Sequence, residues 1–276
     1  MRVNLLIASV IVAALPGSTV AAPDKTIPQN QFAEEIADKS VSFIATDLRT
    51  DLSCQLEGSD LQTRHAPWST FKIPNFLIAM DTGAVEGPDV TRTWDQTRRP
   101  ASAFWPAAWR KDQTLRTAFQ VSAVWYFQDI ALAVGSDHYQ QTLNAWRYGT
   151  ATLPEGSDDF WLNNGLEISV QEQIDFLTAL HRRELGVSDK AFSALTGVSH
   201  AWSGLNVTLH GKTVSGPRGD RLGGFEGWYI GWVARPDTAP TVFALYATAP
   251  HFWNLRDFRK SFAITLLQTC GFLPAR

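Results

Sequence analysis

The sequence lacks a surplus of charge of either sign, and it lacks tracts of low complexity. Its 24 lysines and arginines nearly balance its 27 aspartates and glutamates, which gives a formal net charge of −3, and the basic residues are scattered. That distribution leaves no electrostatic footprint for nucleic acid or for an anionic membrane, so we expect neither as a partner. Hydrophobic residues make up 45% of the chain, which is ample material for a core.

Internal repeats and Ser/Gly-rich linkers are also absent, so nothing divides the chain into separate domains. The 276 residues fit one large domain or two that pack closely together. We expect a single domain that runs from residue 23 to residue 276.

Residues 1–22 have the features of a signal peptide. Arg2 precedes an apolar run from Leu5 to Leu15, Pro16-Gly17 interrupts the run, and Val20-Ala21-Ala22 is a plausible cleavage sequence. The apolar run is too short to span a bilayer, so no membrane span is expected after cleavage near Ala22. Because Pro23 directly after the cut is unfavourable, cleavage one residue earlier stays an alternative, as does a buried N-terminal helix.

Cysteine and histidine are too sparse to indicate a metal site. The six histidines show no ligand spacing with each other or with Cys54 and Cys270, so no zinc site is expected. Export permits a disulfide, but two cysteines in a sequence do not prove one. The state of Cys54 and Cys270 stays open.

Hydrophobic periodicity predicts strands near both ends of the mature chain and helices between them. Residues 41–57 alternate apolar and polar, which indicates a hairpin, and strands return over 205–247 around a Gly-rich turn at 216–227. Apolar residues at three- and four-residue spacing predict helices from 69 to about 185, and an amphipathic helix over 256–270 closes the chain. This order favours an α+β fold, in which an antiparallel β-sheet flanked by N- and C-terminal helices has an inserted all-helical subdomain.

The sheet part is expected to cover about 23–64 and 196–276, and the helical part about 65–195. Ser169 and Glu172 form a capping box at the start of one helix, and Gly271 is a C-terminal stop for the last one. A functional site would lie where the helical part meets the sheet.

Ser69 and Lys72 are the first candidates for chemistry. Three residues apart on a helix, their side chains share a face, and this geometry lets a serine nucleophile have an adjacent base. Lysine acts as a base only when neutral, which from a reference pKa near 10.4 requires a dry site, and Trp68 and Phe71 supply one. Pro74 removes a helical N–H, so we expect an irregular helix there.

Two further segments contain residues that could act together with Ser69 and Lys72. Ser122 could relay a proton and Val124 could wall off the lysine, although a helix serine next to a core valine is the simpler interpretation. Lys212, Thr213 and Ser215 lie on a predicted strand that could bind an anion and pair with an extended substrate, and alone they would be an ordinary exposed strand.

Together, these elements in this order resemble the signature of penicillin-recognising serine enzymes. The chain is similar to the class D (oxacillinase-type) serine β-lactamases over about residues 40–272. Val124, where class A enzymes and most transpeptidases have asparagine, separates class D and its receptor relatives from the rest of the superfamily. The resemblance rests on S-T-F-K-I-P-N at 69–75, S-A-V-W-Y-F-Q at 122–128, Y-G at 148–149, F-W-L-N-N-G-L-E-I-S at 160–169, H-G-K-T at 210–213, G-W-Y-I-G-W-V at 227–233 and R-K-S at 259–261.

The resemblance implies hydrolysis of the β-lactam amide of penicillin-type antibiotics through a serine acyl-enzyme. Ser69 would be the nucleophile, and Lys72, carboxylated on its amine by carbon dioxide, would be the general base for acylation and deacylation. Trp161 would hold this carbamate through its indole N–H, and Ser122 would pass a proton to the leaving nitrogen. No metal or organic cofactor is implied, only carbon dioxide or bicarbonate.

The resemblance also implies how substrate is held. Lys212 and Thr213, with Arg259 reaching over, would bind the substrate carboxylate, and the N–H groups of Ser69 and Ser215 would form the oxyanion hole. Arg259 as a helix-surface charge is the alternative, because Arg256 lies one turn away. The implied protein is periplasmic, binds a small-molecule β-lactam, and is a monomer or a homodimer.

Two departures from the family pattern bear on activity. The family's K-T-G is here K-T-V, so the side chain of Val214 stands where glycine lets substrate approach the strand. A one-residue deletion after Thr213 is an alternative alignment. The usual Y-G-N is Y-G-T, with Thr150 in place of an amide. We therefore predict weak or narrow activity.

Two other functions remain as alternatives. A β-lactam-acylated sensor or degenerate homologue that does not turn over is favoured by Val214, although a signal peptide without membrane helices fits the free enzyme better. A peptidoglycan carboxypeptidase is disfavoured by Val124.

Overall fold

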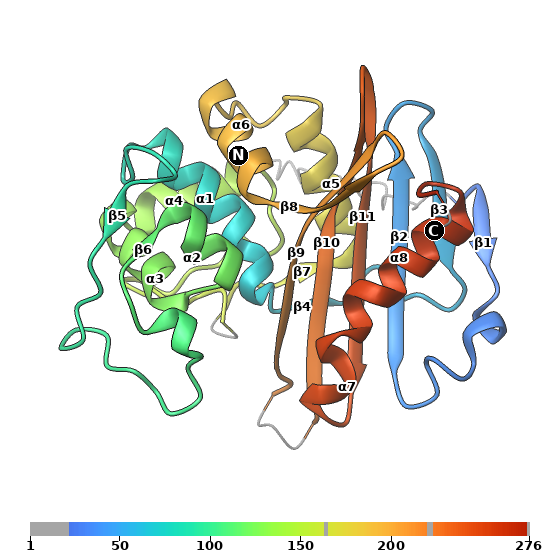
Figure 1. The fold of residues 1–276 in the computed structure, drawn as a ribbon, viewed down its shortest axis with the longest axis horizontal. Coiled ribbons are helices and arrows are strands. Elements are labelled where there is room, and N and C mark those ends of the chain that lie inside the picture. The colour runs from blue at the N-terminus through green and yellow to red at the C-terminus, as the bar shows by residue number, and fades with distance from the viewer. Residues whose placement is uncertain (1–21, 163–164, 220–222, 275–276) are drawn as a thin grey trace, which may run out of the picture.

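The computed structural model describes residues 22–162, 165–219 and 223–274 (Figure 1). The predicted signal peptide, 1–22, lies outside the described residues except for Ala22. Within them the chain has an α+β fold built on a seven-stranded sheet, which confirms the predicted fold class. Across the sheet the strands run β1 (Lys25–Ile27), β3 (Leu52–Leu56), β2 (Ser40–Asp47), β11 (Thr238–Ala249), β10 (Phe225–Arg235), β9 (Val207–Pro217) and β8 (His200–Gly204).

Helices cover both faces of this sheet. In Figure 1 the C-terminal helix α8 crosses one face, while the helical block lies beside β8 and β9. Two short ribbons, β4 (Arg64–His65) with β7 (Ile168–Ser169) and β5 (Thr91–Arg92) with β6 (Gln113–Thr114), complete the fold. The helices are η1 (Gln29–Phe32), η2 (Trp68–Phe71), α1 (Lys72–Asp81), η3 (Ala107–Trp109), α2 (Leu115–Val121), α3 (Val124–Val134), α4 (Ser136–Ala145), α5 (Val170–His181), α6 (Asp189–Val198), α7 (Phe252–Arg256) and α8 (Phe258–Cys270), where η marks a 3-10 helix.

Strand alternation divides the core into two clusters, one on each face of the sheet. Along β10, Trp228, Ile230 and Trp232 face the helical block, whereas Tyr229 and Val233 face α8. This is the period-two pattern of a strand with both faces buried. The helical block therefore packs against one face of the sheet, and α8 packs against the other.

The sequence predicted most of these elements, but it did not predict the strands at the two edges of the sheet. The hairpin of β2 and β3, the strands of the C-terminal third and the closing helix are present as expected. Two edge strands were not predicted: β8, and β1, which pairs parallel with β3 and makes the sheet mixed. The expected N-terminal helix is only the 3-10 turn η1, and the closing helix is divided into α7 and α8.

Two local signals read from the sequence act as expected. The Ser169 hydroxyl accepts from the backbone N–H of Glu172 at 3.1 Å, and the Glu172 carboxylate accepts from the Ser169 N–H at 2.9 Å. These reciprocal bonds are the predicted capping box at the start of α5. Gly271 ends α8 in the left-handed conformation, with φ of 82°.

The interpretation of Ser122 as a helix serine is wrong. The chain leaves α2 there with φ of 60° and ψ of 34°, and α3 begins only at Val124. A left-handed residue cannot continue a right-handed helix. Ser122 therefore lies at the tip of a turn between two helices rather than on a helix face.

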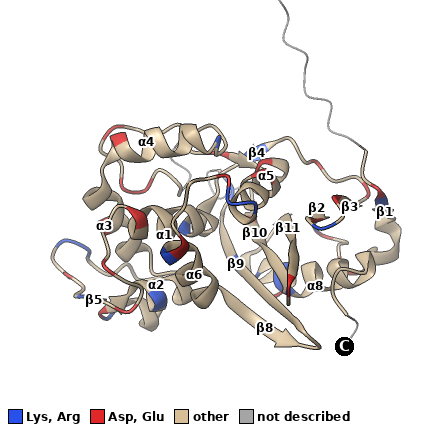
Figure 2. Ribbon diagram, turned by 90° about the horizontal axis from the view of Figure 1, so that it is seen from above, with Lys and Arg blue, Asp and Glu red and all other residues tan. Residues whose placement is uncertain are grey.

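Cys54 and Cys270 form a disulfide with Cα atoms 5.9 Å apart. The bond joins β3 to the last residue of α8, and so ties the C-terminal helix to the strand next to the edge strand β1. In Figure 2, acidic and basic residues are interspersed along the ribbon. Over the described ranges no helix is long and apolar enough to cross a membrane.

Candidate active site

Ser69 and Lys72 meet at the junction of two helices. Ser69 lies in η2 and Lys72 is the first residue of α1, and the lysine Nζ donates to the Ser69 hydroxyl at 2.7 Å. The Thr70 hydroxyl donates to the carbonyl of Pro67 at 2.6 Å and holds the 3-10 turn. Pro74 lies in the first turn of α1, where a helical N–H has no partner to lose. The predicted irregularity is thus the 3-10 turn, which lies before the proline.

Lys72 lies in the dry environment that the sequence predicted. Its side chain has 0% exposed surface, and its Nζ lies 5.2 Å from the ring centroid of Phe127. Burial, and then the positive charge of Lys212, hold the pKa of Lys72 well below its usual value. The structure thus makes Lys72 an available proton acceptor beside the Ser69 hydroxyl.

Ser122 and Lys212 form the second pair. The Lys212 ammonium on β9 donates to the Ser122 hydroxyl, and also to the carbonyl of Thr213 at 3.1 Å. Burial, and then the charge of Arg259, lower the pKa of Lys212 to about 7. A serine hydroxyl next to such a lysine can accept and pass on a proton near neutral pH.

The turn that presents Ser122 is held by tryptophans that the sequence did not single out. The indole N–H of Trp109 donates to the carbonyl of Val121 at 2.7 Å, and the indole N–H of Trp125 donates to the carbonyl of Trp109 at 2.8 Å. These bonds fix the residue directly before Ser122. The only sequence signal was the density of tryptophan in this segment, which does not reveal the contacts.

Arg259 is buried against β10 at Gly227 rather than on the helix surface. It is 6% exposed, and it donates to the backbone carbonyls of Leu255 at 2.8 Å and Arg256 at 3.1 Å. Burial lowers its pKa to about 10. The alternative interpretation of Arg259 as a surface charge is therefore wrong.

Ser215 lies next to this arginine. A Cβ placed on Gly227 would lie 2.6 Å from Arg259 Cδ and 2.8 Å from Ser215 Oγ, so only glycine leaves room for both side chains. Among the described residues, neither Ser215 Oγ nor Arg259 Nη1 has a hydrogen-bond partner. Two buried polar groups with free hydrogen-bonding capacity thus lie side by side behind Thr213.

Trp161 packs directly behind the Ser69 turn. Its ring stacks on Phe71 at a centroid distance of 5.4 Å, and its carbonyl accepts from the backbone N–H of Trp68 at 2.9 Å. The Trp161 ring is fully buried, and its indole N–H has no acceptor within the described part of the chain. Such a donor fits an anionic group carried by a neighbouring side chain.

The two valines of interest lie on different elements, α3 and β9. Val124 is half-buried at the start of α3, directly after the Ser122 turn. Val214 is half-buried on β9, opposite Trp228, and packs against the cluster shared with the helical block. Because side chains alternate along a strand, Val214 lies on the same face of β9 as Lys212.

The Thr150 hydroxyl forms hydrogen bonds that hold its own loop in place. Its hydroxyl donates to the carbonyl of Gly165 at 3.3 Å and accepts from the N–H of Glu167 at 3.1 Å. Gly149 before it has φ of 55°, and a Cβ there would lie 2.0 Å from the Glu167 carbonyl oxygen. The Y-G-T segment is thus fastened to the chain just before β7.

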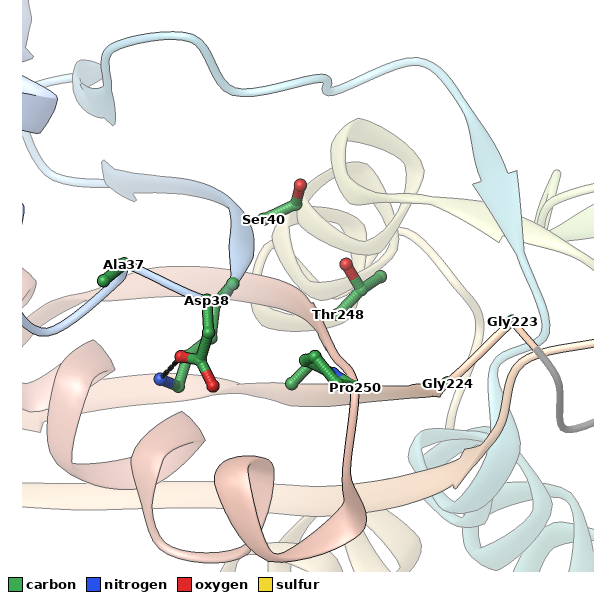
Figure 3. Close-up of a pocket in the computed structure, with 9 residues that line it drawn as sticks. Ala37, Asp38, Ser40, Gly223, Gly224, Thr248 and Pro250 are labelled. Atoms are coloured by element: carbon green, nitrogen blue, oxygen red, sulfur yellow. Dashed lines mark hydrogen bonds and ion pairs between the residues drawn. The ribbon is translucent and has the colours of Figure 1, made fainter.

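A surface depression at another place contains none of the predicted site residues. Figure 3 shows this region, of about 650 Å³, between the start of β2 and the end of β11. Lys39 there is paired with Asp38. No group of three or more His, Cys, Asp or Glu side chains suited to a metal ion occurs among the residues described.

The family follows from comparison with known proteins. The model of the penicillin-binding protein transpeptidase domain matches residues 17–261. The β-lactamase OXA-20 of Pseudomonas aeruginosa is 30% identical over 257 residues, which cover 92% of each chain. The chain belongs to the class D β-lactamase family. A probable β-lactamase of Bacillus subtilis, YbxI, is 32% identical over 200 residues, 72% of each chain.

Solved structures agree with this membership. The class D β-lactamase of Sebaldella termitidis has a TM-score of 0.80 and 26% identity, and the match covers 91% of this chain and 100% of that one. The C-terminal domain of the Bacillus licheniformis BlaR penicillin-receptor also has a TM-score of 0.80, with 24% identity over 93% of this chain. The latter likeness shows the shared fold.

Proposed function

We propose that this class D family member hydrolyses the β-lactam amide of penicillin-type antibiotics through an acyl-enzyme on Ser69. The observation that supports this most is the 2.7 Å contact between a fully buried Lys72 amine and the Ser69 hydroxyl. A general base carried by Lys72 can remove the hydroxyl proton as Ser69 Oγ attacks the β-lactam carbonyl. The new ester bond forms, and the C–N bond of the β-lactam ring breaks.

The leaving nitrogen receives its proton from Ser122. The Lys212 ammonium, bonded to the Ser122 hydroxyl and with a pKa lowered to about 7, can restore the proton that Ser122 gives away. Negative charge on the carbonyl oxygen is stabilised by the backbone N–H groups of Ser69 and Ser215. One such donor typically accounts for about 10²–10³ in rate.

Substrate is held at its carboxylate by Lys212, Thr213 and Arg259. The unpartnered Arg259 Nη1 and the neighbouring Ser215 hydroxyl support an anion site at this edge of β9. A charge-assisted hydrogen bond to a carboxylate is about twice as strong as a neutral one. This site would orient the β-lactam carbonyl toward Ser69.

Carboxylated Lys72 is the proposed form of the general base. The residues present fit this group, because the lowered pKa leaves the amine free to react with carbon dioxide and the Trp161 N–H has no other acceptor. When present, the carbamate supplies an oxygen base that can activate water for deacylation. The half-buried Val124 lies at the neighbouring turn and is proposed to shield the site from bulk water.

The protein is proposed to act in the periplasm after its signal peptide is removed. Its activity is proposed to be weak or narrow, because Val214 occupies the face of β9 where glycine would let substrate lie close to the strand. We propose a monomer or a homodimer.

A second candidate function is a penicillin-binding sensor that is acylated and does not turn over. The observation that favours it is Val214, which obstructs the strand at which a substrate would be positioned for hydrolysis. Incubation of the mature chain with benzylpenicillin, with and without bicarbonate, separates the two. Hydrolysis that bicarbonate stimulates and that Ser69→Ala abolishes supports the enzyme, whereas one stable adduct per chain supports the sensor.

A further inference from the structure

Trp68, which directly precedes the proposed nucleophile, has an unusual backbone conformation. Its φ is 50°, in the left-handed region that bulky L residues rarely adopt. Its backbone N–H donates to the carbonyl of Trp161 at 2.9 Å, so the chain is fixed on this side of the turn. Such a conformation persists only where the surroundings over-determine it.

The indole ring of Trp68 is wedged against β9 at Gly216. A Cβ on Gly216 would lie 2.4 Å from Cε2 of the indole and 2.5 Å from Cζ2, so the ring lies where any other residue would place its side chain. In the sheet register Gly216 pairs with Glu226 on β10. The glycine therefore admits the ring at one defined rung of the sheet.

A buried carboxylate at the same rung fixes the ring. The Trp68 indole N–H donates to Glu226 Oε1 at 2.7 Å, and the hydroxyl of Tyr246 on β11 donates to Glu226 Oε2 at 2.7 Å. Glu226 is only 5% exposed. His65 stacks on Tyr246 at 3.9 Å between ring centroids and closes this network. A charge-assisted bond in dry surroundings is strong and directional.

We propose that Trp68 is a positioning residue for the oxyanion hole. The N–H of Ser69 belongs to the peptide unit that joins it to Trp68, so the conformation of Trp68 sets where this donor points. The second proposed donor, the N–H of Ser215, belongs to the residue before Gly216. By packing against Gly216 and donating to Glu226, Trp68 links the two segments that carry these donors. The inference rests on the proposed function of Ser69.

Four variants test this coupling. Trp68→Phe retains a ring but loses the N–H donor, and Glu226→Leu removes the acceptor. Glu226→Gln keeps an amide oxygen that accepts the indole N–H, and its amide can donate to the Tyr246 oxygen. Trp68→Gly adopts positive φ without strain but has no ring. Trp253→Phe, at an indole residue that is 73% exposed, is the matched control.

The readout is the second-order rate constant for acylation of Ser69 by benzylpenicillin, followed by intact mass, together with Tm. We expect Trp68→Phe, Trp68→Gly and Glu226→Leu to lower this constant roughly 10- to 100-fold, up to the cost of losing one oxyanion donor. Glu226→Gln and Trp253→Phe should stay within about threefold of wild type. Loss of folded protein would lower the fraction of chains that become acylated at completion but not the rate constant of those that react, so the final extent of acylation is recorded beside the rate constant.

The same variants are treated with a fluorophosphonate, which labels an activated serine through its oxyanion hole without a β-lactam ring. If penicillin fails to acylate wild type but the probe labels Ser69, the proposed function fails and the variants are compared with the probe. If Trp68→Phe and Glu226→Leu react as fast as wild type, or if Glu226→Gln is as slow as Glu226→Leu, the positioning role is overturned. A wild-type Ser69 inert to both reagents overturns both proposals.

Discussion

The Lys72 amine lies 2.7 Å from the Ser69 hydroxyl, and Lys72 has no exposed surface. In water the amine would be protonated and could only donate to the serine. Burial and the charge of Lys212 lower its pKa, so that it can accept a proton instead. In the proposed function, the same contact would activate Ser69 as the nucleophile and would leave Lys72 an amine that can react with carbon dioxide.

The first prediction concerns the Trp161 indole N–H. If it holds a carbamate on Lys72, Trp161→Phe keeps the ring stacked on Phe71 but removes the donor. A hydrogen bond to a charged group contributes about 1.5–3 kcal/mol, so the bicarbonate concentration for half-maximal activity should rise at least about 10-fold. Hydrolysis measured across a bicarbonate series checks this, together with the ¹³C NMR signal of labelled carbamate.

Trp253→Phe is the control for that experiment and should leave the bicarbonate dependence unchanged. A labelled carbamate signal that survives in Lys72→Ala would show that the modified lysine is a different one. A bicarbonate dependence identical in Trp161→Phe and wild type would contradict the assigned role of the indole.

The second prediction concerns Val214. Val214→Gly removes the only side chain between Lys212 and Gly216 on the face of β9 toward the helical block, so substrate can lie closer to the strand. We expect kcat/KM for benzylpenicillin to rise roughly 10-fold, which corresponds to about 1.4 kcal/mol. Val214→Ala should fall between the two. No gain in either variant, with wild-type rates typical of a fast hydrolase, would refute the obstruction by Val214.

The third prediction concerns the disulfide between Cys54 and Cys270. The bond closes a loop with a sequence separation of 216 residues. Loss of a cross-link over so long a loop typically costs about 2–4 kcal/mol, because the unfolded chain gains freedom. Replacement of both cysteines by serine should therefore lower the urea midpoint, and reduction of the wild type should have the same effect. Equal urea midpoints for the oxidised wild type, the reduced wild type and the serine variant would contradict a stabilising disulfide.

The fourth prediction concerns stability at acid pH. Burial, then the charges of His210 and Arg183, lower the pKa of His181 to about 3, whereas the unfolded chain has about 6.5. Above pH 6.5 both states are neutral and the contribution to stability is full. As the pH falls from 6.5 toward 3, only the unfolded state binds the proton, so stability decreases by up to about 1.4 kcal/mol per pH unit.

His181→Phe tests that prediction, since a phenyl ring can keep the contacts with Phe192 and Trp232. Urea denaturation at pH 7 and pH 5 should show a smaller loss in the variant than in wild type. The exposed His138→Phe is the control and should behave as wild type. An equal pH dependence in all three proteins would contradict a neutral, buried His181.

The sequence predicted what depends on local spacing. The Ser169–Glu172 capping box, the stop at Gly271 and the proximity of Ser69 to Lys72 each follow from residues within one helical turn. The α+β order followed from the change of hydrophobic period along the chain. These features need no knowledge of distant contacts.

Other features depend on residues far apart in the chain. The left-handed turn at Ser122 is held by Trp109, and a non-glycine residue gives no local sign of such a turn. The bond between Trp68 and Glu226 spans 158 residues. Pairing of the two cysteines required their Cα distance, and the burial of Arg259 required the space above Gly227. Such contacts are set by tertiary packing, which periodicity cannot reveal.

The central claim is that Ser69 is acylated by a β-lactam. Its most direct test is the mass of the protein, and of the peptide that contains Ser69, after mixing with benzylpenicillin. Rapid acid quench, intact mass and peptide mapping should show one penicilloyl group on Ser69 in wild type. The adduct should be absent in Ser69→Ala and formed far more slowly in Lys72→Ala. No adduct and no hydrolysis in wild type, or an adduct that persists in Ser69→Ala, would contradict the account.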